Sequence, residues 1–438
     1  MKIRALVSLF LLVAPGAAFA LPSESLRAKV DAYLAPYVAA KDFAGTVLLA
    51  KGGKVLLRKG YGLANQELGV PNHPETRFQI GSVTKTFTAA AVVLLDRQGL
   101  LHLDDPLSKY IPGFPRGGEI RISHLLGHSS GIPDMYSLPE YEEMKTRHVA
   151  ITDLIALLET KPLDFAPGTS SSYSNSGYAL LAYIVERVSG RTYQDFLRER
   201  IFAPLHLDHT GFWERQPILP GRAAGYEPWL PPAGVINTPY YDESILFGSG
   251  DLYSTVDDLY AWYQAIREGR LFRLDSLREP YGWGPRKRFG RDEVEQDGAD
   301  PGFVAHLGAY LKDDACVVVL GNIRTAAIDR IKVDLEGLVF GEKVEPPAPR
   351  KTVKVDPGAF DAYVGSYEAG PKMILTVERR GGNLFLKGTG GIFLPLEPLS
   401  ESRFFYRQLY VPLVFDRGPD GKVSQVLWDG KYPCKKVQ

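Results

Sequence analysis

The chain has little cysteine: its 438 residues include two, Cys316 and Cys434. Two thiols are too few for a disulfide framework or for a zinc site built from four cysteines, although a single bridge between them stays open. The chain also lacks a charge excess, because 51 lysines and arginines face 51 aspartates and glutamates. Balanced charge creates no field that draws in nucleic acid or an anionic membrane surface, so a small uncharged partner is favoured.

Apolar residues, in contrast, are plentiful. Hydrophobic residues make up 45% of the chain and aromatic residues 11%, enough to bury a large core in more than one domain. Glycine-rich phosphate loops are missing. His206 and His209 lie three residues apart but have no nearby residues that would complete a set of metal ligands. We therefore predict neither a cofactor nor a metal ion.

A secretory signal is predicted over residues 1–20. MKIRALVSLFLLVAPGAAFA carries Lys2 and Arg4, then an apolar run, then a small-residue ending before a cleavage point after Ala20. A proline–glycine step interrupts the apolar run, which is shorter than the roughly 20 residues that a membrane span needs. The sequence thus predicts a periplasmic or secreted protein with no membrane span after cleavage.

A proline-rich linker, VEPPAPRK at 344–351, divides the remaining chain into residues 21–343 and 352–438. The second part has short apolar runs separated by Gly-Gly and Pro-Asp-Gly turns, which is typical of a small closed or nearly closed β-barrel. Within it, Phe404 to Tyr406 should lie in the barrel core on one face and under a covering patch on the other.

Residues 21–343 have strand patterns at both ends and helical patterns between them. Two strands joined through Gly52-Gly53 are predicted near the N-terminus, and strands return in GFVAHLGAYL and CVVVLGN. The helices include one over 84–98, stopped by Gly99, and one that begins with Ser254 as its cap. We predict an α+β fold, in which one antiparallel sheet is assembled around a helical insertion.

The helix over 84–98 begins beside a chemically suggestive pair, Ser82 and Lys85 in GSVTK. Three residues apart, they share one helix face. A serine hydroxyl needs a base, and a lysine can act as one only if its surroundings, such as the following apolar residues, lower its pKa. Gly81 allows a sharp turn, so the free N–H of Ser82 can face an oxyanion. One turn of chain thus offers a nucleophile, a base and half an oxyanion hole.

A second motif is Tyr173-Ser174-Asn175, in PGTSSSYSNSGYALLAYIVERVSG. With Ser82-Val83-Thr84-Lys85 and ISHLLGHSSGIPD, it makes about residues 25–340 resemble the penicillin-recognising serine hydrolases. This group includes class C β-lactamases, D,D-peptidases, D-aminopeptidases and related esterases. The resemblance implies a β-lactamase/transpeptidase-like antiparallel sheet with helices. The segment after the linker resembles a lipocalin-like barrel that often accompanies such domains.

The third family motif departs from its usual form. The family has Lys-Thr-Gly or His-x-Gly five residues ahead of a Gly-Phe step, whereas this chain has Gln296-Asp297-Gly298 ahead of Gly302-Phe303. His306-Leu307-Gly308 matches by letters but follows that step, where the strand should already lie inside the sheet. Glutamine forms hydrogen bonds without charge. Esters or amides without a carboxylate are therefore favoured over β-lactams and D,D-peptides, although a nearby arginine such as Arg291 could compensate.

The resemblance also implies residue roles. Ser82 would form an acyl-enzyme, with either Lys85 or Tyr173 as its base. Tyr173 would relay a proton, which requires a phenol of depressed pKa. The expected substrate and oxyanion contacts come from Asn175, Gln296, Gly298 and the N–H groups of Ser82 and Ala299.

Two alternatives remain at this stage. Gly127-His128-Ser129-Ser130-Gly131 fits the nucleophile elbow of α/β-hydrolases, but that elbow needs a strand before it, and ISHLL favours a helix. The chain could also be an impaired family member that binds a cell-wall peptide or small molecule, because a fold does not guarantee its chemistry. We predict an exported serine hydrolase acting on an ester or a D-amino-acid amide or peptide, and we leave its oligomeric state open.

Overall fold

The computed structural model describes residues 25–231, 233–274, 279, 281–370, 373–389, 391–418 and 422–437. The predicted secretory signal lies outside the described residues. Among the described helices, none combines the length and the hydropathy of a membrane span.

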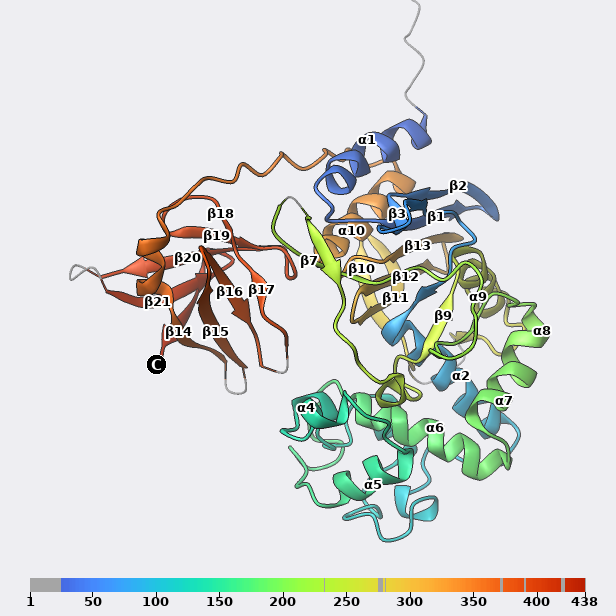
Figure 1. The fold of residues 1–438 in the computed structure, drawn as a ribbon. Coiled ribbons are helices and arrows are strands. Elements are labelled where there is room, and N and C mark those ends of the chain that lie inside the picture. The colour runs from blue at the N-terminus through green and yellow to red at the C-terminus, as the bar shows by residue number, and fades with distance from the viewer. Residues whose placement is uncertain are drawn as a thin grey trace, which may run out of the picture.

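Within the described part of the chain, six strands form an antiparallel sheet in the order β10-β11-β12-β13-β1-β2 (Figure 1). These strands are β1 (Gly45–Lys51), β2 (Lys54–Tyr61), β10 (Gly284–Arg288), β11 (Arg291–Asp300), β12 (Phe303–Tyr310) and β13 (Ala315–Gly321). Gly45 pairs with Gly321, so strands from both ends of this region meet in one sheet. The predicted α+β sheet is confirmed.

Helices cover both faces of this sheet. Val317 and Val319 pack with α1 (Leu26–Ala39) and α10 (Ala327–Phe340), whereas Val318 and Leu320 pack with α2 (Thr84–Arg97) and α9 (Val256–Glu268). Successive side chains of a strand point to opposite faces, so an uninterrupted apolar run supplies both cores.

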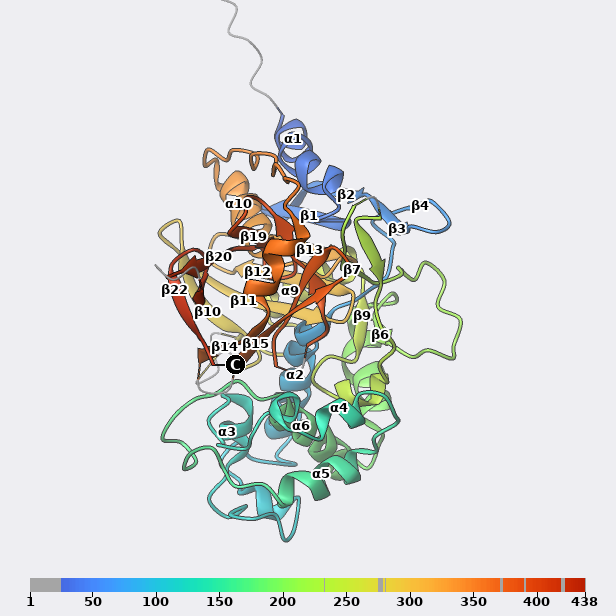
Figure 2. The same cartoon turned by 60° about the vertical axis from the view of Figure 1, so that its left-hand side comes forward.

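The insertion between β2 and β10 is mostly helical, and both views place α3 to α6 at the end of the molecule away from α1 (Figures 1 and 2). Its helices besides α2 and α9 are α3 (Ile122–Leu126), α4 (Tyr141–Met144), α5 (Ile151–Glu159), α6 (Asn175–Ser189), α7 (Tyr193–Leu197) and α8 (Ala203–Leu205). Its short strands are β3 (Leu63–Asn65), β4 (Val70–Pro71), β5 (Phe78–Gln79), β6 (Gly211–Phe212), β7 (Tyr226–Pro228), β8 (Val235–Asn237) and β9 (Leu252–Ser254).

One predicted cap is wrong by a residue. The side chain of Thr255, not of Ser254, accepts the N–H of Asp258 at 3.3 Å and caps α9. Ser254 is the last residue of β9, and its hydroxyl pairs with that of Thr210 at 2.8 Å. Ser254 is therefore held in a strand, one residue before the cap position.

The C-terminal region is a nine-stranded sheet that nearly closes into a barrel, at the left of Figure 1. In the described chain its strands are β14 (Gly365–Gly370), β15 (Met373–Arg380), β16 (Asn383–Lys387), β17 (Leu394–Pro395), β18 (Glu397–Pro398), β19 (Arg403–Tyr406), β20 (Val411–Arg417), β21 (Val423–Trp428) and β22 (Tyr432–Lys436). Phe404 and Tyr406 lie in its core, while Phe405 packs outside against Tyr410, as the alternation predicted.

The two cysteines belong to different regions. Cys316 is buried in β13 and Cys434 in the barrel, and both are free thiols. The disulfide bridge that the sequence left open is therefore not formed.

The barrel is fastened to the N-terminal region through Arg407, whose side chain is only 4% exposed. Its guanidinium group donates to Asp42 Oδ1 at 2.9 Å and to the carbonyl oxygens of Trp229 and Gly234 at 2.8 and 2.7 Å. Arg350 of the linker also donates to Asp42. Because a buried charge left without its partner is costly, these contacts fix the position of the barrel.

Candidate active site

Three predicted residues meet at the start of α2. Ser82 lies in a 3₁₀ turn, Gly81–Val83, directly before the helix. Lys85 Nζ donates to Ser82 Oγ at 3.0 Å, and Tyr173 OH donates to the same oxygen at 2.6 Å. Tyr173 comes from the loop before α6, so the insertion supplies the third group. The amine and the phenol are thus both within hydrogen-bond distance of the serine hydroxyl.

Lys85 is buried, with 1% of the residue exposed. Its Nζ donates to Ser82 Oγ, to Asn175 Oδ1 at 2.8 Å and to Ser249 O at 2.7 Å, and all three acceptors are neutral. Burial lowers the pKa of Lys85 to about 7, although the more distant carboxylates of Asp300 and others oppose the shift. A substantial fraction of Lys85 therefore has a free lone pair near neutral pH.

Tyr173 does not have the depressed pKa that its relay role was predicted to need. Although 47% of the residue is exposed, burial of the phenol raises its pKa above the ordinary value. Its ring packs against His128 with centroids 4.6 Å apart. Burial lowers the pKa of His128 to about 4, so this imidazole is neutral, and its Nδ1 accepts the N–H of Ser174 at 3.1 Å. His128 thus orients a neutral phenol.

Asn175 is held by a carboxylate that the sequence reasoning did not single out. Its Nδ2 donates to both oxygens of Asp134 at 3.2 Å, and its backbone N–H donates to Asp134 Oδ1 at 3.0 Å. These bonds turn the amide oxygen of Asn175 toward Lys85. Asp134 lies at the end of ISHLLGHSSGIPD, a stretch that had been singled out only as a whole.

Two glycines let β11 approach the serine turn. A Cβ on Gly298 would lie 2.0 Å from Ile80 O and 3.1 Å from Ser82 N, and one on Gly81 would lie 2.7 Å from Ala299 N. Gly81 also has φ of +49°, a conformation that favours glycine. Ser82 and Ala299, whose backbone N–H groups are the predicted oxyanion donors, consequently border the same cleft, a cavity of about 650 Å³ that Gln296 also lines.

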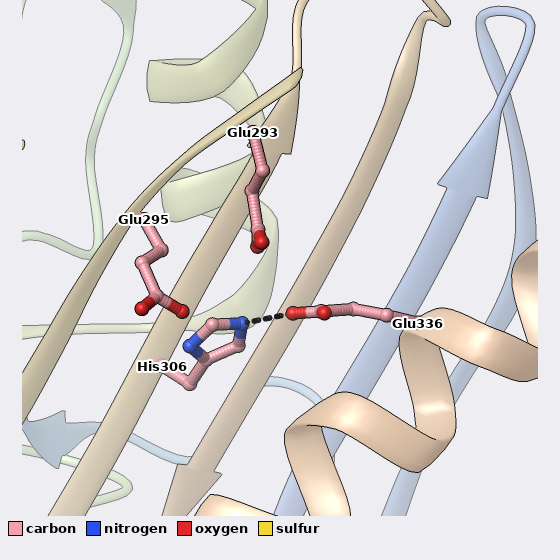
Figure 3. Close-up of side chains that lie close together, drawn as sticks. All are labelled: Glu293, Glu295, His306 and Glu336. Atoms are coloured by element: carbon pink, nitrogen blue, oxygen red, sulfur yellow. Dashed lines mark hydrogen bonds and ion pairs between the residues drawn. The ribbon is translucent and has the colours of Figure 1, made fainter. Parts of the chain in front are cut away.

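Gln296 and Asp297 of the third motif point to opposite faces of β11, because successive side chains of a strand alternate. Both Gln296 and Asp297 border the cleft, but the carboxylate of Asp297 forms ion pairs with His306 Nδ1 at 2.8 Å and with Lys332 of α10. His306 is fully buried and also meets Glu336 of α10 at 2.9 Å (Figure 3). His306-Leu307-Gly308 therefore does not supply the third motif.

The surroundings of His306 offer a possible set of metal ligands. Ligand atoms of Glu293, Glu295, His306 and Glu336 lie within 4.8 Å of one another (Figure 3). However, burial is outweighed by the carboxylates of Asp297 and Glu336, which raise the pKa of His306 to about 9. Both ring nitrogens then carry protons at neutral pH, which leaves no lone pair for a metal.

Cations also already neutralise the carboxylates of this group. Arg288 donates to Glu295 and Glu336 at 3.0 Å each, and Lys332 donates to Glu295 at 3.2 Å. The group fits an ion-pair network better than a metal centre.

Sequence reasoning missed the arginine that does reach the cleft. Arg324, in the segment after β13, lines the same cavity as Ser82. Arg291, which had been named as a possible substitute for the missing cation, instead pairs with Asp313 at the hairpin end of β11. No spacing rule in the sequence indicated that the loop after β13 would face Ser82.

The alternative nucleophile is not in the required setting. The helix α3, rather than a strand, precedes Ser129, whose N–H donates to His124 O at 2.8 Å. A nucleophile elbow joins a strand to a helix, so Ser129 does not form one.

Comparison with known proteins agrees with this geometry. The family model described as Beta-lactamase matches residues 30–330. The chain belongs to this family. It is 31% identical over 426 residues to Penicillin-binding protein 4* of Bacillus subtilis, covering 88% of this chain and 93% of that protein. Membership makes the chain a serine hydrolase of the beta-lactamase family, as its motifs predicted.

Two further relatives extend the comparison. Teichoic acid D-alanine hydrolase of Staphylococcus aureus is 29% identical over 244 residues, which cover 56% of this chain and 58% of that protein. The solved octameric penicillin-binding protein homologue from Pyrococcus abyssi is 23% identical with a TM-score of 0.62, covering 93% of this chain and 98% of that one. The second comparison shows that the fold is shared over nearly the whole chain.

Proposed function

We propose that the protein is an exported hydrolase that cleaves an ester or a D-amino-acid amide or peptide through an acyl-enzyme on Ser82. One observation carries this proposal: Ser82 Oγ lies 3.0 Å from a buried lysine amine and 2.6 Å from a phenol. The relative that hydrolyses D-alanine from teichoic acid supports this substrate class. The signal motif within residues 1–20 supports export.

Acylation follows from these positions. Neutral Lys85 takes the proton of Ser82 as Oγ attacks the substrate carbonyl, and the N–H groups of Ser82 and Ala299 stabilise the resulting oxyanion. Lys85 is the base because burial lowers its pKa to about 7, whereas the pKa of Tyr173 is raised. Tyr173 then gives its proton to the departing alkoxide or amine and recovers one from Lys85, which leaves Lys85 neutral again.

Deacylation reverses the proton path. A water molecule attacks the acyl carbonyl while Lys85, through Tyr173, accepts its proton. When the tetrahedral intermediate collapses, Ser82 Oγ leaves and regains a proton, and the carboxylic acid product departs. Asn175 keeps the Lys85 amine aligned with Ser82 throughout, because Asp134 fixes its amide.

Gln296 shapes the substrate preference. It provides hydrogen bonds but no charge at the third-motif position, so a carboxylate on that side of the substrate gains no ion pair. Arg324 places a positive charge in the cleft from the loop after β13 instead. Because Gln296 itself offers no charge, we favour simple esters and D-amino-acid amides over β-lactams, whereas a carboxylate that reached Arg324 would find a cation there.

A substrate panel tests the proposal. Purified protein would be assayed with short-chain aryl esters, D-amino-acid anilides, a chromogenic cephalosporin and a D-Ala-D-Ala peptide, alongside Ser82→Ala and Ser129→Ala. We expect Ser82→Ala to abolish ester or anilide turnover and Ser129→Ala to retain it, with slow cephalosporin cleavage. Folded wild-type protein that hydrolyses nothing and resists a fluorophosphonate at Ser82 would instead support a binding module.

A further inference from the structure

A second cavity, of about 680 Å³, lies between the barrel and the N-terminal region. We call it the barrel chamber. From the N-terminal region, Tyr136, Asp300 and Arg324 line it, and from the barrel, Met373, Leu386 and Trp428 do so. The chamber and the Ser82 cleft are neighbours, since Ala299, Asp300, Arg324 and Leu409 border both.

Part of the barrel core also forms a wall of the chamber. Aromatic rings pack the interior at Tyr363, Phe404 and Phe415, with centroid separations of 4.5 to 5.7 Å. Leu375 and Leu386 belong to the same core, yet they also line the chamber. The barrel thus presents an apolar mouth to the cleft.

Hydrogen bonds fix the position of one wall of the chamber relative to the N-terminal region that contains Ser82. Gln408 O accepts the N–H of Ala326 at 2.7 Å, and the neighbouring Arg407 anchors the turn between β19 and β20 to Asp42. Both Gln408 and Leu409 border the chamber and the cleft. A ligand in the chamber would therefore keep a fixed distance from the nucleophile.

The order of residues along β11 indicates whether the acyl group or the leaving group of a substrate lies nearer the chamber. Gln296 lies on one side of the oxyanion residue Ala299, beside Tyr173, the proton donor for the leaving group. Asp300 lies on the other side and borders the chamber, which neither Gln296 nor Tyr173 does. The leaving group thus points toward Gln296, and the acyl group points toward the chamber.

We propose that the barrel chamber is the acyl-binding subsite and that it takes an apolar acyl group, such as an alkyl chain or the side chain of a large D-amino acid. This inference rests on the proposed function. The chamber has the size that is usual for sites binding small organic molecules, and apolar side chains of the barrel such as Leu375 and Leu386 form one wall of it. The barrel would then determine acyl-chain specificity.

A chain-length series tests the proposal. Wild-type protein would be assayed with p-nitrophenyl esters from acetate to octanoate. We expect kcat/KM to rise about fourfold for each buried methylene, the gain expected from its transfer out of water. A flat or falling series would overturn the proposal.

Two adjacent residues of β15 provide a matched pair of variants. Met373 and Ile374 are 44% and 37% exposed, and of the two only Met373 lines the chamber. Met373→Trp should remove most of the octanoate gain and leave the acetate rate unchanged, whereas Ile374→Trp should behave as the wild type. Equal behaviour of Met373→Trp and Ile374→Trp would contradict the chamber assignment.

A binding measurement separates failure of this inference from failure of the proposed function. In Ser82→Ala, octanoate should displace an anilinonaphthalene dye from the chamber, and Met373→Trp should weaken that displacement at least about tenfold. If no ester is hydrolysed but displacement follows this pattern, the hydrolase proposal fails and the chamber stands. If esters are hydrolysed but octanoate displaces no dye, the chamber proposal fails alone.

Discussion

Two buried lysines, Lys85 and Lys332, lie on either side of β11 and have opposite properties. They are 1% and 5% exposed. Lys85 donates only to neutral oxygens, and burial lowers its pKa to about 7. Lys332 pairs with Glu295 and Asp297, which outweigh burial and raise its pKa. Burial alone therefore does not make a lysine a base; the charge of its hydrogen-bond partners decides.

The difference between the two lysines follows from the alternation of side chains along β11. On β11, Gln296 and Gly298 lie on one face of the strand, whereas the carboxylates of Glu295 and Asp297 on the other face pair with Lys332 of α10, although Asp297 also borders the cleft. Neighbouring residues thus serve separate purposes. At positions 296 and 298 the cleft face places no carboxylate against Lys85, and Asp300 on that face acts on Lys85 only from a distance, whereas the other face supplies carboxylates directly to Lys332. The following predictions test this difference, from the largest expected effect on rate to the smallest.

Replacing Lys85 by alanine should have the largest effect. The substitution removes the base but leaves Ser82 and the oxyanion N–H groups in place, so we expect kcat/KM for an aryl ester to fall by about 10³-fold or more. Circular dichroism checks that the protein is folded. A loss of less than tenfold in folded protein would mean that Lys85 is not the base.

Tyr173→Phe should have the next largest effect. It removes the phenol that contacts Ser82 at 2.6 Å but keeps the ring that packs on His128. We expect kcat to fall by about 10²-fold, as for loss of a general acid, and esters with good leaving groups should be affected least. The check is a comparison of p-nitrophenyl and alkyl leaving groups, and equal losses for both would argue against proton delivery by Tyr173.

Exchanging Asn175 and Asp134 would give Lys85 a carboxylate as a hydrogen-bond partner, as Lys332 has. In the double variant Asn175→Asp/Asp134→Asn, the hydrogen-bonded pair is kept, but a carboxylate replaces the amide oxygen 2.8 Å from Lys85 Nζ. An adjacent carboxylate raises a lysine pKa by about one unit or more, so activity at neutral pH should fall about tenfold. The rate should recover at higher pH; if it stays low, the loss has another cause.

Lys332→Met should hardly change the rate. It removes one cation from Glu295 and Asp297, which keep Arg288 and His306 as partners, so the free energy of unfolding should fall by about 1.5–3 kcal/mol in chemical denaturation. Because Lys332 faces away from Ser82, kcat/KM of the folded protein should stay within about threefold of the wild type. A shift in the pH dependence of the rate would show that the two faces are coupled.

The sequence predicted what depends on local spacing. The helical face shared by Ser82 and Lys85, the two-strand hairpin at Gly52-Gly53 and the sheet that unites both ends of the region all follow from periodicity and turn residues. The Tyr173 and Asn175 pair was predicted from a motif, and the structure brings it to Ser82 and Lys85.

What the sequence did not reveal depends on packing between distant elements. Arg324 reaches the cleft because the loop after β13 happens to border it, and the chamber needs the barrel docked through Arg407. The raised pKa of Tyr173 reflects burial, which no local pattern encodes. Asp134 could have been found by asking what holds the amide of Asn175.

The most direct test of the account is the pH dependence of the rate at which a fluorophosphonate labels Ser82 in the wild-type protein. A neutral Lys85 is required for attack, so the rate should be low in acid, rise with pH and level off above a midpoint near 7. A midpoint close to the ordinary lysine pKa of about 10.4 would contradict the claim that neutral hydrogen-bond partners and burial make Lys85 the base.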